Sequence, residues 1–71
     1  MSTSQLQHLI SMINQISSNN NYNKSDEETA CFVANHIRSF WARSMKEQIL
    51  QYADEDGSKL SNASKIALTQ L

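Results

Sequence analysis

The sequence contains no proline, a single glycine and a single cysteine. Proline and glycine are the residues that most often interrupt helices, so their scarcity leaves long stretches of the chain free to be helical. The lone Cys31 cannot form an internal disulfide and offers no set of thiolates for a zinc site. We interpret it as a small, partly buried apolar residue.

An excess of charge and long apolar runs are also lacking. Six Lys and Arg stand against seven Asp and Glu, a net charge of −1, which provides no basic surface for nucleic acid. No apolar run approaches the ~20 residues of a membrane-spanning helix. Residues 1–4 lack the positive flank and apolar core of a signal peptide. We therefore expect a cytoplasmic protein that binds neither nucleic acid nor membrane.

What the chain does contain is helical periodicity in four short segments, with no strand pattern. We predict an all-α fold: a small compact bundle of about four short helices, mostly antiparallel to their neighbours, with residues 1–71 as a single domain. A chain of 71 residues buries only about 60% of its unfolded surface. Such a domain is marginally stable or completes its burial against a partner.

The first helix is predicted over about residues 4–18. Its apolar side comprises Leu6, Leu9, Ile10, Ile13 and Ile16. We interpret the opposite side, which includes Asn14, as an ordinary solvated face. Residues 17–24 are rich in serine and asparagine and predict a flexible linker, which Tyr22 could anchor to the core.

The second helix is predicted to begin after Ser25, whose pairing with Glu28 matches a capping box, and to end near Trp41 or Ala42. It carries two apolar stripes. The first comprises Ala30, Val33, Ala34, Ile37 and Trp41, and the second comprises Phe32, His36 and Phe40. A short helix in so small a domain cannot bury both stripes unless it is central, so we expect one aromatic stripe to be left for another contact.

The third helix is predicted to start at Ser44, in a second capping box with Glu47, and to stop at the turn before Gly57. Its apolar side comprises Met45, Ile49, Leu50 and Ala53, with Tyr52 at the edge. A fourth helix follows the capping hydroxyl of Ser61. One side of this last helix is lined by Ala63, Ile66, Ala67 and Leu71.

The residues provide no constellation for catalysis, and we expect no catalytic, cofactor-binding or metal-binding residue. A Cys/His catalytic pair needs both groups within hydrogen-bond reach. Cys31 and His36 are five positions apart on one helix, about 500° of rotation, and therefore diverge.

The second helix does provide a candidate partner-binding surface, comprising Phe32, Asn35, His36, Arg38 and Phe40. In this interpretation His36 and Arg38 form the polar rim of an aromatic patch that docks on another protein, because aromatic residues and arginine often carry interface energy. The alternative is that each of the two instead caps a carbonyl or pairs with an acid.

In this same stretch the chain resembles the delta subunit of the cytoplasmic NAD-linked, molybdenum-dependent formate dehydrogenases. The matching residues are Asn14-Gln15-Ile16, Ala34-Asn35-His36-Ile37-Arg38, Phe40-Trp41, Met45, Ile49-Leu50, Gly57, Leu60-Ser61 and Ala67-Leu68. The specific part is the run Asn-His-Ile-Arg-x-Phe-Trp. The match covers about residues 6–71.

The resemblance implies a small non-catalytic subunit that binds the large catalytic subunit and supports its assembly, its stability or the insertion of its molybdenum cofactor. The implied complex carries molybdopterin, iron–sulfur clusters and FMN and uses NAD, whereas this chain would hold no cofactor of its own. The alternative is a free-standing regulatory or homo-oligomeric helical protein, with the aromatic patch pairing with its own copy.

Overall fold

The structure is a computed structural model and describes residues 4–22 and 24–71. These residues form four helices and no strand, which confirms the predicted all-α class. The helices are α1 (Gln5–Asn19), α2 (Asp26–Phe40), α3 (Arg43–Glu55) and α4 (Asn62–Thr69). None of them is long and apolar enough to cross a membrane.

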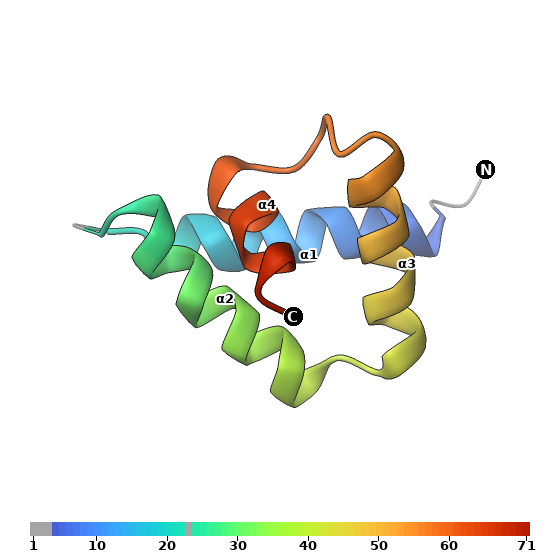
Figure 1. The fold of residues 1–71 in the computed structure, drawn as a ribbon, viewed down its shortest axis with the longest axis horizontal. Helices are drawn as coiled ribbons and strands as arrows, with labels where there is room; N and C mark the ends of the chain where they lie inside the picture. Colours follow the sequence, from blue (N-terminus) through green and yellow to red (C-terminus); the bar gives the residue numbers. More distant parts are fainter. Residues whose placement is uncertain (1–3, 23) are drawn as a thin grey trace.

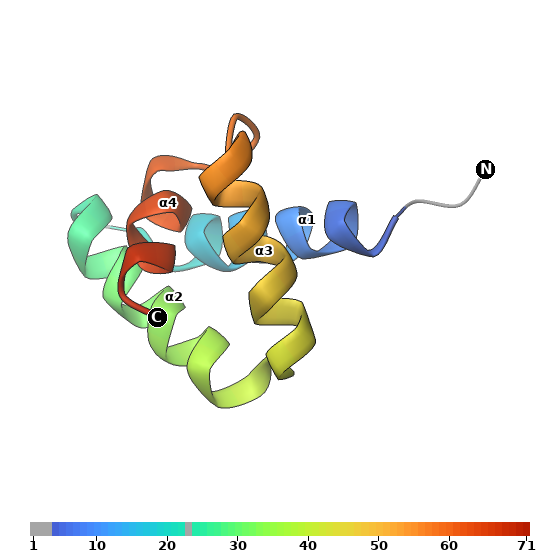
Figure 2. The same ribbon diagram turned by 45° about the vertical axis from the view of Figure 1, so that its right-hand side comes forward.

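The helices do not form a simple antiparallel bundle. Helix α1 lies along the long axis of the molecule, and α4 packs mainly against α2 (Figure 1). In both ribbon views α3 runs across α1 rather than alongside it (Figures 1 and 2), so the prediction of mostly antiparallel neighbours is wrong for this pair. The physical reason is the connection before α3. Trp41 and Ala42 both have extended backbone, with ψ of 139° and 156°, and turn the chain sharply between α2 and α3.

The core is built around the first apolar stripe of α2, as predicted. Ala30, Val33, Ala34 and Ile37 are fully buried, and Trp41 is 5% exposed. The other buried apolar residues are Leu9, Ile10, Ile13, Ile49, Leu60, Ala63, Ala67 and Leu68. Helix α2 thus supplies a full side of the core and packs against α1 and α4, whereas α1 and α4 each contact all three other helices.

Serine hydroxyls begin three of the four helices. Ser25 Oγ accepts from the N–H of Glu28 at 3.1 Å while Glu28 Oε1 accepts from the N–H of Ser25, so the predicted capping box is confirmed. Ser4 and Ser61 cap α1 and α4 in the same way. The predicted box at Ser44 is wrong: α3 begins at Arg43, with Ala42 at the N-cap and no side-chain bond. The sharp turn already makes Ala42 extended, so the helix starts before the serine is reached.

The predicted first helix is confirmed to within one residue at each end, but three expectations, about the linker, Tyr22 and Cys31, are wrong. Helix α1 continues to Asn19, because Ser17 is buried and its hydroxyl donates to the carbonyl of Ile13 at 2.9 Å. The linker is thus shorter than residues 17–24, and Asn23 within it lies outside the described residues. Tyr22 is 83% exposed and anchors nothing, and Cys31 is exposed on the outer side of α2.

A polar cluster joins α1 to the segment that leads into α4, and Asn14 is at its centre. Asn14 Nδ2 donates to the carbonyl of Lys59 at 2.8 Å, and its Oδ1 accepts from the N–H of Ser61 at 3.0 Å. The buried Ser64 hydroxyl lies 3.0 Å from Asn14 Oδ1 and 2.8 Å from the Ser17 hydroxyl. We had expected Asn14 to lie on a solvated face, and this expectation is wrong. Its amide can satisfy one donor and one acceptor of the same loop at once.

The turn after α3 forms as predicted. Gly57 has φ of +67°, a conformation in which a side chain is strained. A Cβ at this position would lie 3.1 Å from the carbonyl oxygen of Ala53. The turn leads through Leu60, which is buried ahead of the Ser61 cap.

Candidate functional site

The second stripe of α2 lies on the surface. Phe32 is 45% exposed and Phe40 is 75% exposed, whereas His36 between them is partly buried. The rings of His36 and Phe40 are 4.8 Å apart between centroids and tilted by 41°. Because the first stripe occupies the core side of the same helix, the four-residue spacing of these rings holds them at the edge of the solvent-facing side.

These three rings form one continuous surface with two polar neighbours. Phe32, Asn35, His36, Ser39 and Phe40 line a shallow, open depression, which we call the α2 aromatic face. It brings together four of the five predicted partner-binding residues. Ser39 was missed from the sequence, although its position three residues after His36 already places it on this side of a helix.

Charge lies at one end of the α2 aromatic face. The ammonium of Lys24 lies 5.7 Å from the centroid of the Phe32 ring, within the range of a cation–π contact. The first turn of α2 carries Asp26, Glu27 and Glu28, which favour the positive end of the helix dipole. The middle of the face carries no Lys, Arg, Asp or Glu side chain, so it presents aromatic surface with a mixed-charge border.

Arg38, the fifth predicted residue, lies outside the depression and has a structural contact. Its Nη1 donates to Asn35 Oδ1 at 2.8 Å and its Nη2 donates to the carbonyl of Gln70 at 3.0 Å. Gln70 is the C-cap of α4, so the guanidinium caps the C-terminal end of that helix. Of the two sequence-based alternatives for Arg38, the carbonyl cap is the one observed.

Lys46 has the same kind of contact at the end of α2. Its ammonium donates to the carbonyl of Arg38 at 3.3 Å. A cation at a helix C-terminus is favourable because the last carbonyls have no partner within the helix. Sequence reasoning missed this contact, because it depends on the angle between α2 and α3.

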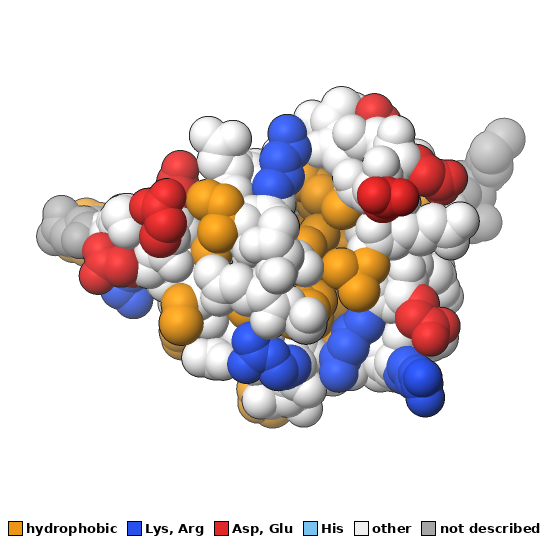
Figure 3. All heavy atoms as spheres, in the orientation of Figure 1, with side chains coloured by type: hydrophobic (Ala, Val, Ile, Leu, Met, Phe, Trp, Pro, Cys, Tyr) orange, Lys and Arg blue, Asp and Glu red, His pale blue; other side chains and the backbone are white. Residues whose placement is uncertain are grey.

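A second hollow lies on another side of the molecule, between α3 and α4. It has a volume of about 430 Å³, and we call it the α3–α4 groove. Apolar side chains show between the two helices at the centre of the face in Figure 3. Its walls come from helices that are separated in the sequence, so no local pattern indicates it.

Among the described residues, no group of three or more His, Cys, Asp and Glu side chains is placed to hold a metal ion. The α2 aromatic face combines aromatic rings with small polar groups, and the α3–α4 groove combines aliphatic with charged side chains. Such surfaces suit contact with another macromolecule.

Comparison with known proteins identifies the family. Residues 8–68, most of the chain, match the family described as the NADH-dependent formate dehydrogenase delta subunit FdsD. No curated protein and no solved structure matches the chain. The match includes all of α2 and α3, and with them the α2 aromatic face and the α3–α4 groove except for Thr69. The chain therefore belongs to the delta-subunit family of the NADH-dependent formate dehydrogenases.

Proposed function

We propose that this chain is a non-catalytic accessory subunit that binds the large catalytic subunit of a formate dehydrogenase. In that role it supports assembly, stability or insertion of the molybdenum cofactor of the large subunit. The observation that carries the proposal is the family match over residues 8–68. Formate oxidation, molybdopterin, the iron–sulfur clusters and FMN would then belong to the other subunits of a cytoplasmic complex.

The α2 aromatic face is the surface that we propose for this contact. Phe40 keeps 75% of its surface in water, although burying a phenylalanine side chain is worth about 1.5–3 kcal/mol. Neither Phe32 nor Phe40 is buried in the core of the free chain. A partner that covers both rings therefore gains apolar burial without dismantling the domain. Asn35 and Ser39 provide polar groups at the edge of the contact.

The direct test is a binding titration of the purified chain against the purified large subunit. We expect Phe40→Ser and Phe32→Ser each to weaken binding by about 1–2 kcal/mol, as for interface residues of intermediate importance. Met12→Ser is the matched control, because Met12 is 40% exposed on α1 and does not line the α2 aromatic face. Normal binding by both phenylalanine variants would remove the α2 aromatic face from the proposal, and no binding by the native chain would refute the proposed function.

The role in cofactor insertion needs a second measurement. The large subunit is produced with and without this chain, and its molybdenum content and its yield are determined. Equal content and equal yield would refute a role in assembly. The alternative function, a free-standing homo-oligomer, is tested by sedimentation: a tight dimer with no affinity for the large subunit would favour it.

A further inference from the structure

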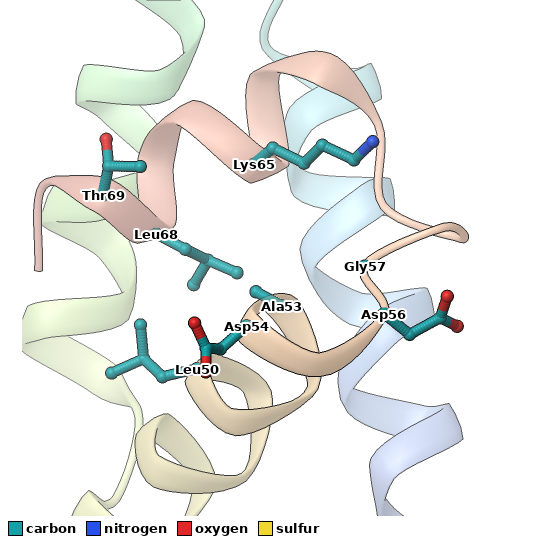
Figure 4. A pocket seen from close by; sticks show the side chains of 8 residues that line it. All are labelled: Leu50, Ala53, Asp54, Asp56, Gly57, Lys65, Leu68 and Thr69. Carbon is teal, nitrogen blue, oxygen red and sulfur yellow. The ribbon is translucent and has the colours of Figure 1, made fainter.

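The α3–α4 groove has an apolar floor and charged edges. Leu50, Ala53 and Leu68 meet at its centre, whereas the side chains of Lys65 and Asp56 point away from it (Figure 4). A site for a small polar ligand needs polar groups that converge on the ligand. Here Lys65 and Asp56 diverge, and of the charged groups only the Asp54 carboxylate lies among the leucines (Figure 4), so the groove suits a mainly apolar convex surface that brings one basic group.

Helix α3 is the least buried of the long helices, and the groove lies along its exposed apolar side. Among its thirteen residues only Ile49 is buried, although Met45, Leu50, Tyr52 and Ala53 share its apolar side. Leu50 remains 37% exposed at the groove. An occupant of the groove would therefore bury Leu50, and cover Ala53, on the exposed apolar side of α3.

The charges at the edges of the groove differ between its two walls. The α4 wall carries Lys65, and the α3 wall carries Asp54, with Asp56 just beyond the helix. Among the described residues the one ion pair joins Arg43 to Glu47, so neither Lys65 nor Asp54 forms an ion pair with another described residue. The groove is therefore complementary in charge to an occupant that places an acidic side chain near α4 and a basic side chain near α3.

A second copy of the chain fits the groove poorly. Two copies related by a two-fold axis would bring two hollows together and leave the floor uncovered. The α2 aromatic face of another copy is itself a shallow depression and would not fill the groove, and a head-to-tail contact of this kind does not close but forms open chains. A single helix has the required convex shape, because helices commonly place an apolar stripe into a groove between two other helices.

We propose that the α3–α4 groove holds one amphipathic helix of the large catalytic subunit. That helix presents apolar side chains at three- and four-residue spacing to Leu50 and Leu68, an acidic side chain to Lys65 and a basic one to Asp54. This inference rests on the proposed function. It makes the groove a contact separate from the α2 aromatic face, so that the large subunit holds the chain on two sides.

The test is a titration of purified large subunit with four variants: Leu50→Glu, Lys65→Glu, Asp54→Lys and the control Met12→Glu. Met12 matches Leu50 in exposure, 40% against 37%, and lies outside both surfaces. We expect Leu50→Glu to raise the Kd at least about tenfold, as for a central interface residue, and Met12→Glu to leave it within about twofold. The two charge reversals should weaken binding at low salt and do so less at high salt. Circular dichroism of each variant checks that it remains folded.

Hydrogen exchange of the native chain provides an independent readout. Backbone amides of α3 should exchange more slowly when the large subunit is bound. If a folded Leu50→Glu variant binds like the native chain, the inference about the groove is overturned. The proposed function would still be supported if Phe40→Ser weakens binding. Failure of the native chain to bind overturns both. Concentration-dependent association of the native chain that Leu50→Glu abolishes would assign the groove to another copy and also overturn the inference.

Discussion

Replacing Asn14 with alanine should weaken the fold more than any other change on the outer side of α1. The Asn14 amide bonds the carbonyl of Lys59, the N–H of Ser61 and the hydroxyl of Ser64, at 2.8, 3.0 and 3.0 Å. These contacts join residues 45 to 50 positions apart in the chain. They fix the loop that delivers α4 to its place against α2.

The magnitude follows from the exposure of the three partners. A hydrogen bond contributes about 0.5–1.5 kcal/mol net. Lys59 and Ser61 are exposed, so water can partly replace the amide there, whereas Ser64 is fully buried but retains its contacts with Ser17 and Ser61. Three such bonds would contribute about 1.5–4.5 kcal/mol, and because water and the remaining serine contacts replace part of this we expect Asn14→Ala to lower the free energy of unfolding by about 2 kcal/mol, in the lower half of that range. For a domain of this size the Tm should fall by about 8–16 °C.

The assay is urea denaturation and thermal melting followed by circular dichroism. The control is Gln15→Ala, because Gln15 is the next residue of α1, is exposed and makes no side-chain hydrogen bond among the described residues. It should change the free energy of unfolding by less than about 0.5 kcal/mol. Equal effects of the two variants would show that the polar cluster does not hold α4 in place, and would refute the reasoning.

Substitutions at three further positions test other parts of the structure by the same melting measurement. Trp41→Ala should lower the free energy of unfolding by ~3–5 kcal/mol, because the ring is 5% exposed in the core. Trp41→Phe should lower it by at most about half as much, because it keeps an aromatic ring and removes a buried N–H that has no partner. An equal loss for both variants would contradict this. Thr29→Val should stabilise by about 0.5–1 kcal/mol, because the buried Thr29 hydroxyl has no partner, and a loss of stability would indicate an unseen bond. Gly57→Ala should destabilise by about 1–2 kcal/mol and Gly57→Asn by less, because asparagine tolerates positive φ; the reverse order would contradict the turn.

The local features of this chain could be read from its sequence. The capping box at Ser25, the cap at Ser61 and the positive φ of Gly57 each depend on a few neighbouring residues. The division of α2 into a core stripe and an exposed aromatic stripe follows from the 3.6-residue period alone. For the same reason four of the five candidate partner-binding residues, Phe32 to Phe40 without Arg38, were already placed on one face.

Two of the errors concern contacts between distant segments. Ser17 looked like the start of a linker because serine and asparagine are poor helix formers, but a buried bond to Ser64 of α4 keeps it in α1. Asn14 looked solvent-facing by its position on the helix, and only the approach of the loop before α4 gives its amide partners.

The amino-acid sequence by itself therefore determined the four helices, most of their caps and which side of each helix is apolar, because these depend on residues within one or two turns. The tertiary structure alone decided the steep crossing of α3, the cap that Arg38 makes on α4 and the α3–α4 groove. Each of these depends on the angle at which helices meet, which results from the packing of whole helix faces and is not encoded in the period or caps of any one helix.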